Sequence, residues 1–227
     1  MIKINYNLVM KEIENMGLIP YFQFYMANNQ SLIIPYHNCN HMLQLLYHII
    51  KAYRYDPKKL STYDYVKLLL AGMYHDFNHS GGVLDDADNI VLAKKGLFNA
   101  IEKTSPLVSL DDIKDIYHII DATQYPYIID DKDLSYSQSI IRDADLLVRL
   151  SYDYFTQTLC GLKSELKIDD YIQLLNGDKS FLSKSFSSMR TQYGEDIVKT
   201  HHSSLVDYME QISNMFIDGN VKRSNSV

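Results

Sequence analysis

Apolar residues recur at spacings of three and four along most of this chain, which is the pattern of helices that bury one face against a core. Only five prolines and nine glycines interrupt the 227 residues, so the pattern has few breaks. The sequence therefore predicts an all-α fold, a compact helical bundle. The expected helices span residues 5–16, 39–54, 62–79, 87–103, 110–123, 137–155, 169–176 and 201–217.

Domain organisation follows from length and composition. A chain of 227 residues is long enough to bury a sizeable core and lies in the range where one domain is the usual outcome. The hydrophobic fraction of 46% and the charged fraction of 22% are those of a globular protein and exclude general disorder. No internal repeat or Gly/Ser linker marks a boundary, so we expect a single domain over residues 1–227.

Charge and apolar runs exclude several classes of partner. The formal net charge is −6 and no long basic run is present, so the electrostatic signature of a duplex nucleic-acid binder is missing. No run of about 18 apolar residues occurs, and the N-terminal segment MIKINYNLVMKEIENMG is amphipathic with acidic residues rather than a secretion signal. Two cysteines are too few for a disulfide scaffold, and we expect a cytoplasmic protein with no membrane partner.

Two pairs of histidines carry the first chemical signal. His37 and His41 occur in YHNCNH, and His75 and His79 occur in YHDFNH. If each pair is helical, its two imidazoles project from one face, one turn apart. The second pair ends the expected helix 62–79, whose nearly all-apolar interior VKLLLAGMY predicts a buried central helix with a rigidly anchored last turn.

Aspartates add carboxylates to this pattern. Asp76 directly follows His75, and because neighbouring helical residues point about 100° apart, both face one ion only at a helix end or across a groove. Asp143 and Asp145 lie in RDADLL, where an acid among apolar residues needs a partner that offsets its desolvation. Residues two apart on a helix face different ways, so we expect only one of these two to reach a metal. Imidazoles combined with carboxylates favour metal-assisted hydrolysis, in which a bound water is ionised near neutral pH.

Three blocks in this order, YHNCNH, HDFNHSGG and DADL, resemble the signature of the HD superfamily of metal-dependent phosphohydrolases. Within that superfamily the chain is most similar to the catalytic core of the class I 3',5'-cyclic nucleotide phosphodiesterases, and it also resembles small bacterial HD phosphohydrolases. The resemblance covers residues 35–150 and implies a bundle of the HD-domain/phosphodiesterase type. Residues 156–217 are expected to complete the bundle and to cap the pocket.

The resemblance also implies roles for individual residues. His37 would be the general acid that protonates the leaving oxygen, and His79 would orient a water on a second metal ion. Thr123 matches a small polar residue near that ion. Two divalent ions are implied, a tighter one of zinc, iron or manganese and a second one of magnesium or manganese that Asp76 and water hold. The implied ligands of the tighter ion are His41, His75, Asp76 and Asp145.

The activity implied is hydrolysis of a 3',5'-cyclic nucleotide, or of a related cyclic nucleotide messenger, by attack of a metal-activated hydroxide. The expected partner is then a small-molecule phosphate ester, and exposed helices leave a homodimer open. Two alternatives use the same residues: a nucleotide phosphohydrolase or 5'-nucleotidase, and a catalytically silent sensor that binds a nucleotide without turnover. The glutamine and the aromatic clamp that hold the purine in the phosphodiesterases have no clear counterpart here, so the substrate base stays open.

Other polar residues are expected to serve structure. His48 is predicted to be a structural histidine, and His118 a hydrogen-bonded helix histidine, with a place in the pocket lining as the alternative. Asp143 is predicted to be a helix-surface acid or a neighbour of the metal ligands. The phosphodiesterase pattern expects an asparagine soon after HDFNHSGG, where the nearest candidate is Asn89. Three acids of the next segment are predicted to be polar surface, or acids at the site mouth that affect the second ion: Asp85, Asp86 and Asp88.

Overall fold

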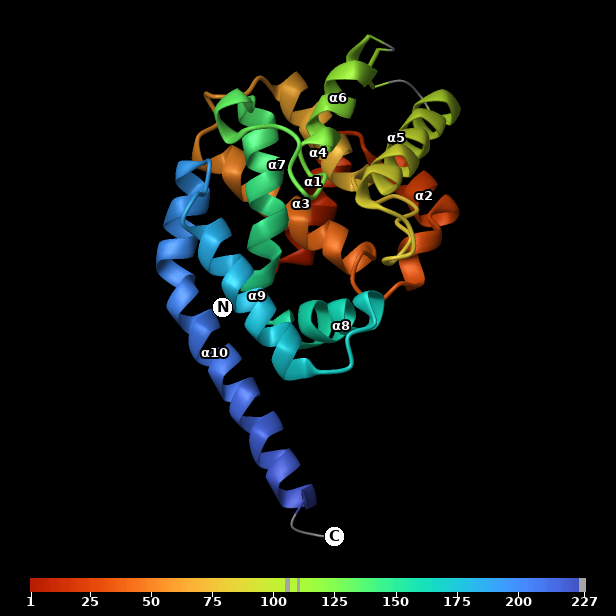
Figure 1. The fold of residues 1–227 in the computed structure, drawn as a ribbon. Coiled ribbons are helices and arrows are strands. Elements are labelled where there is room, and N and C mark those ends of the chain that lie inside the picture. The colour runs from red at the N-terminus through yellow and green to blue at the C-terminus, as the bar shows by residue number, and fades with distance from the viewer. Residues whose placement is uncertain (105–106, 110, 225–227) are drawn as a thin grey trace.

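Helices make up almost all of the regular structure in the computed structural model, which describes residues 1–104, 107–109 and 111–224, with side chains to residue 217 (Figure 1). Within these ranges the one pairing of extended backbone is a parallel bridge between Ile2 and Ser151. The prediction of an all-α fold is therefore confirmed. The α-helices are α1 (Tyr6–Asn15), α2 (Ile19–Asn28), α3 (Cys39–Tyr55), α4 (Thr62–Tyr74), α5 (Asp86–Lys103), α6 (Asp112–Asp121), α7 (Tyr136–Leu147), α8 (Cys160–Leu166), α9 (Tyr171–Phe186) and α10 (Gln192–Ser224).

Helix α4 lies at the centre of the bundle, in contact with α3, α6 and α7. It begins at Ser61, whose hydroxyl accepts a hydrogen bond from the backbone N–H of Asp64, as expected of an N-cap. Its interior is buried on nearly all sides, as its apolar sequence predicts. Gly72 lets α3 approach closely, because a Cβ atom there would lie 2.6 Å from Cδ1 of Ile49.

The predicted helix 62–79 is too long at its C-terminal end, because α4 stops at Tyr74 and His75 is its C-cap. The next residues form a tight turn in which Asn78 has a positive φ of 59°. Two contacts from the segment before α3 hold this turn. The Asn29 side-chain oxygen accepts from the N–H of Asn78 at 2.7 Å, and the Ser31 hydroxyl donates to the carbonyl oxygen of Asp76 at 3.2 Å. The helix end is therefore determined by residues far away in the sequence.

Residue His37 also lies outside a helix, because α3 begins at Cys39. The Asn38 side chain caps α3 by accepting from the N–H groups of Asn40 and His41. Asparagine is among the preferred N-cap residues, so the start of this helix has a clear local cause. The two histidines of the first pair therefore do not share a helical face.

The predicted helix 137–155 is interrupted after Leu147. A 3-10 turn, η3 (Val148–Leu150), follows α7, and a π-helix, η4 (Tyr154–Leu159), then leads into α8. The break arises because residues 150 and 152 pair with Ile2, whose N–H donates to the Leu150 carbonyl oxygen at 2.7 Å.

Several other helix boundaries differ from the prediction. Helices α2 and α8 were not predicted, and α9 continues through Gly177 to Phe186, past the predicted end at residue 176. Helix α10 begins nine residues before the predicted position of 201, at Gln192. Residue 110, the predicted start of the α6 helix, lies outside the described residues.

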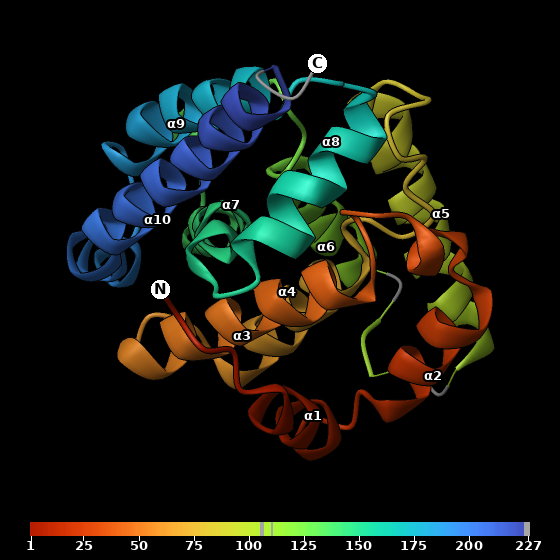
Figure 2. The same cartoon turned by 90° about the horizontal axis from the view of Figure 1, so that it is seen from below.

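The C-terminal helices cover one side of the central group. Helices α9 and α10 lie side by side and contact α7, and the far end of α10 extends beyond the rest of the bundle (Figures 1 and 2). Buried apolar side chains from Ile2 to Ile212 form one continuous cluster, so these helices share a core with the N-terminal ones.

Candidate metal centre

The four predicted ligands of the tighter ion meet at one point. His41 comes from the first turn of α3, His75 and Asp76 from the end of α4, and Asp145 from α7. Nε2 of His41 lies 3.1 Å from Oδ1 of Asp145 and 3.2 Å from Oδ2 of Asp76. Nε2 of His75 lies 2.9 Å from the same Asp76 oxygen and 3.3 Å from Nε2 of His41. Two imidazoles and two carboxylates thus direct ligand atoms at one another.

The tautomer of His75 suits a metal ligand. Its Nδ1 lies 2.9 Å from the carbonyl oxygen of Gly72, an acceptor, so Nδ1 carries the hydrogen. Nε2 then presents a lone pair to His41 and Asp76. A backbone carbonyl that fixes a histidine in this way is the usual companion of metal ligation.

The electrostatics of this cluster favour a cation. Burial by itself lowers the pKa of His41, but hydrogen bonds to Asp145 and Asp76 outweigh burial and raise it to about 9. Burial likewise raises the pKa of Asp76, yet the charges of His75 and His37 hold it well below its usual range. Oδ2 of Asp76 faces Nε2 of both His41 and His75, at 3.2 and 2.9 Å. The carboxylates of Asp76 and Asp145 therefore stay ionised. A divalent ion that accepts nitrogen and oxygen ligands would balance their negative charge.

Asp76 also belongs to a second group, with His37 and His79, whose ligand atoms lie within 4.8 Å of one another. The rings of His37 and His79 stack with centroids 3.7 Å apart. Nδ1 of His79 accepts from the N–H of Gly81 at 3.1 Å, so the hydrogen of the neutral ring is on Nε2. Burial and the neighbouring charge of His37 lower the pKa of His79 to about 4, which keeps that ring neutral. His79 is therefore arranged as an N–H donor rather than as a ligand.

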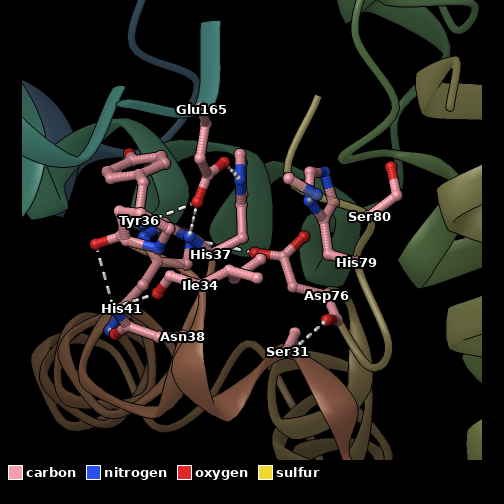
Figure 3. A network of polar contacts seen from close by, with 12 residues as sticks. Ser31, Ile34, Tyr36, His37, Asn38, His41, Asp76, His79, Ser80 and Glu165 are labelled. Atoms are coloured by element: carbon pink, nitrogen blue, oxygen red, sulfur yellow. Dashed lines mark hydrogen bonds and ion pairs between the residues drawn. The ribbon is translucent and has the colours of Figure 1, made fainter. Parts of the chain in front are cut away.

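His37 is held by an acid that the sequence did not single out. Glu165 reaches from α8, and its Oε2 lies 2.6 Å from Nδ1 of His37 (Figure 3). Its Oε1 accepts from the backbone N–H groups of Tyr36 and His37 at 2.6 and 3.0 Å. Burial raises the pKa of Glu165, but the hydrogen bond to His37 outweighs burial and lowers it. No local pattern in GLKSEL distinguishes this glutamate from a surface acid.

Two glycines of HDFNHSGG make room for Glu165. Gly81 and Gly82 have φ values of +65° and +79°, a region that other residues rarely adopt. A Cβ atom on Gly82 would lie 2.6 Å from the backbone oxygen of Glu165. The glycine pair therefore allows α8 to pack against the loop beside the His-Asp turn.

Next to these groups lies a cavity of about 640 Å³. Residues 156–217 contribute much of its wall, through α8 and α9. Three aromatic side chains, Tyr125, Tyr127 and Phe181, line one part of it. Among the described lining residues five are acidic, and Arg149 is the one arginine or lysine. The carboxylates of the lining thus outnumber its one guanidinium, an excess of negative charge that favours cations in the cavity.

The remaining residues named from the sequence fall into two sets. Thr123, Asp86 and Asn89 line the cavity, and Asn89 holds the glycine loop by accepting from the N–H of Ser80 at 2.9 Å. Asp85 and Asp88 are exposed and do not line it.

Asp143 is neither a surface acid nor a neighbour of the ligand cluster. It is 1% exposed and accepts from the N–H groups of Arg190 and Thr191, just before α10 begins. His48 is fully buried, with Nδ1 3.0 Å from the hydroxyl of Tyr193, so the prediction of a structural histidine is confirmed. His118 is exposed on α6 and does not line the cavity.

Comparisons with protein-family models, with curated proteins and with solved structures found no match. The resemblance of the three blocks to the HD superfamily therefore stays a prediction. Of the helices that the structure describes, none is both long and apolar enough to cross a bilayer.

Proposed function

We propose that this protein is a metal-dependent phosphohydrolase, and that it opens the phosphodiester of a cyclic nucleotide or a related messenger. The observation that carries the proposal is the convergence of His41, His75, Asp76 and Asp145 beside a cavity into which an oriented histidine projects. His37 is that histidine, and its side chain is 23% exposed.

The chain provides a fitting set of donors for a divalent ion of zinc, iron or manganese: His41, His75, Asp76 and Asp145. Asp76 also faces His37 and His79, where a second ion, magnesium or manganese, would lie. Such ions, when bound, polarise a phosphoryl group and lower the pKa of water. The partly buried, ionised carboxylates of Asp76 and Asp145 supply the negative charge that would hold them.

His37 would protonate the leaving oxygen. Glu165 accepts from its Nδ1, so Nε2 is the nitrogen left to face the substrate. When His37 is protonated, the adjacent carboxylate stabilises the imidazolium, and after proton transfer it keeps the ring in the correct tautomer. His79 stacks on the same ring and directs its Nε2–H toward the cavity, where it would donate to a water or a phosphoryl oxygen.

The remaining walls of the cavity support the choice of a nucleotide. The rings of Tyr125, Tyr127 and Phe181 offer faces and edges on which a planar base packs. The cavity volume of about 640 Å³ lies in the usual range for small-molecule sites.

The test is product analysis by mass spectrometry. Purified protein is incubated with manganese or magnesium and with cyclic mononucleotides, cyclic oligonucleotides and 5'-nucleotides, with Asp76→Ala as the control. Ring opening by the wild type alone supports a phosphodiesterase and identifies its substrate. Release of inorganic phosphate from 5'-nucleotides, with cyclic substrates untouched, would instead support the nucleotidase alternative. Nucleotide binding without turnover under either metal would support the silent sensor.

A further inference from the structure

Arg149 lies beside the candidate metal centre but belongs to none of the groups described so far. It lies in η3, four residues after Asp145, so both side chains leave the helical backbone on the same side. Among the described residues that line the cavity it is the one arginine or lysine. Any anionic group that enters therefore meets one guanidinium of the protein.

The guanidinium is held on three sides. Its Cζ lies 5.0 Å from the ring centroid of Phe181 and 5.9 Å from that of Tyr36, the residue before His37. Its Nε lies 3.2 Å from Oδ1 of Asp178, and the hydroxyl of Tyr154 donates to the other Asp178 oxygen at 2.6 Å. These contacts fix the orientation of Arg149 before any ligand binds.

Its two terminal nitrogens have no acceptor within the described residues. The ion pair between Nε and Asp178 is the one polar contact of this side chain there, although the side chain is only 13% exposed. By contrast, the buried Arg142 donates to the carbonyl oxygens of Ala122 and Ile129 and to Asp131. The terminal N–H groups of Arg149 are thus left to donate to a ligand, because Arg149 lines the cavity.

We propose that Arg149 binds a non-bridging oxygen of the substrate phosphate. The inference rests on the proposed function, since it concerns the same cavity. The planar guanidinium matches two phosphate oxygens at once, and Asp178 occupies only its Nε side. Tyr36 connects the position of Arg149 to that of His37, so a phosphate whose leaving oxygen reaches His37 lies within reach of Arg149.

A purely structural role makes a different prediction. If Arg149 only neutralises buried Asp178, then removing both charges together restores the site. If Arg149 binds phosphate, the double variant Arg149→Gln/Asp178→Asn stays defective, because no donor fork returns. Lys94→Gln is the matched control, since Lys94 pairs with Asp121 outside the cavity and its loss removes one cation elsewhere.

The experiment is calorimetric titration of manganese-loaded protein with inorganic phosphate, with manganese content measured for every variant. We expect Arg149→Gln and the double variant to weaken phosphate binding by about tenfold or more, Arg149→Lys to weaken it less, and Lys94→Gln to leave it unchanged. Manganese content should be equal throughout. If Arg149→Gln does not fold, Arg149→Lys and the double variant still provide the comparison.

Equal phosphate affinity in the wild type and Arg149→Gln, recovery in the double variant, or no phosphate binding by the wild type would each overturn the inference. A parallel assay with bis(p-nitrophenyl) phosphate separates this result from the proposed function. Hydrolysis that is unaffected by Arg149→Gln removes the inference and keeps the function. If phosphate binding depends on Arg149 but no ester is hydrolysed, the inference stands and the proposed function is contradicted.

Discussion

Oε2 of Glu165 lies 2.6 Å from Nδ1 of His37, although 128 residues separate the two in sequence. The other oxygen of the same carboxylate binds the backbone of Tyr36 and His37, so one side chain fixes both the ring and the main chain that carries it. The acid that orients His37 therefore comes from the part of the chain that carries no recognisable motif.

Replacing Glu165 with glutamine tests this orientation. The amide oxygen can still accept from the backbone N–H groups of Tyr36 and His37. The amide nitrogen carries hydrogens and no negative charge, so it cannot accept a hydrogen bond from Nδ1 of His37. We expect phosphohydrolase activity to fall by about 10- to 100-fold and the pH profile of kcat to shift, with metal content unchanged. Glu102→Gln, at an exposed position on α5, is the control and should behave as wild type.

Replacing His37 with alanine should separate proton transfer from metal binding. Under the proposed function His37 is the general acid for the leaving oxygen, so we expect a rate loss of about 10² to 10⁴-fold. Metal content, measured by mass spectrometry after gel filtration, should stay at the wild-type level. Full activity of this variant on the natural substrate would show that His37 is not the general acid.

Asp76→Ala should abolish metal binding and activity together. The Asp76 carboxylate faces the histidines of both candidate ion sites, His41 and His75 at one and His37 and His79 at the other. Ligand binding stabilises the folded state, by about 2.7 kcal/mol at a hundredfold excess over Kd, so a chelator should lower the Tm of the wild type. It should leave the Tm of Asp76→Ala unchanged. Asp88→Asn, an exposed acid on α5, should respond to the chelator as the wild type does.

His48 should make stability depend on pH in mildly acidic solution. Burial, together with the charge of His201, lowers the pKa of His48 to about 3, whereas an exposed histidine in the unfolded chain titrates near about 6.5. Below about pH 6.5 His48 is protonated in the unfolded chain but stays neutral in the folded state. The contribution of His48 is therefore fully present above about pH 6.5 and is lost as pH falls toward the folded value.

The slope for one such group is about 1.4 kcal/mol per pH unit. The free energy of unfolding should fall less steeply in His48→Gln than in the wild type between about pH 6 and pH 4. This interval lies between the folded and unfolded pKa values of His48. Urea denaturation at several pH values measures this fall. The exposed His118→Gln should keep the wild-type slope, and an identical slope in His48→Gln would contradict the assignment.

Most of the helices and the convergence of His41, His75, Asp76 and Asp145 could be predicted because their signals are local. The apolar interior of α4 indicates a buried helix. The histidines and aspartates stand in short blocks of sequence, and the resemblance of these blocks to the HD superfamily implied which of them would come together. The end of α4 could not be predicted, since Asn29 and Ser31 determine it from another segment. That His37 lies before the helix could be predicted in part, because Asn38 in YHNCNH is a good N-cap residue.

Long-range contacts explain the rest. Glu165 and Arg149 gain their contacts with His37 and Asp178 from the packing of α8 and α9 against the motif-bearing half of the chain, and residues of this type are usually solvated charges. Asp143 was placed wrongly for the same reason, because its partners Arg190 and Thr191 are 47 and 48 residues away. The cytoplasmic location and the homodimer stay predictions.

The contact between Gly82 and Glu165 is one of backbone against backbone. Side chains in contact can change rotamer and absorb small displacements, whereas two main chains have no such freedom. The spacing between the His-Asp turn and the helix that carries Glu165 is thus set by van der Waals contact between the two main chains. A bulkier residue at position 82 would act as a wedge, moving the acid away from His37 while leaving every functional side chain chemically intact.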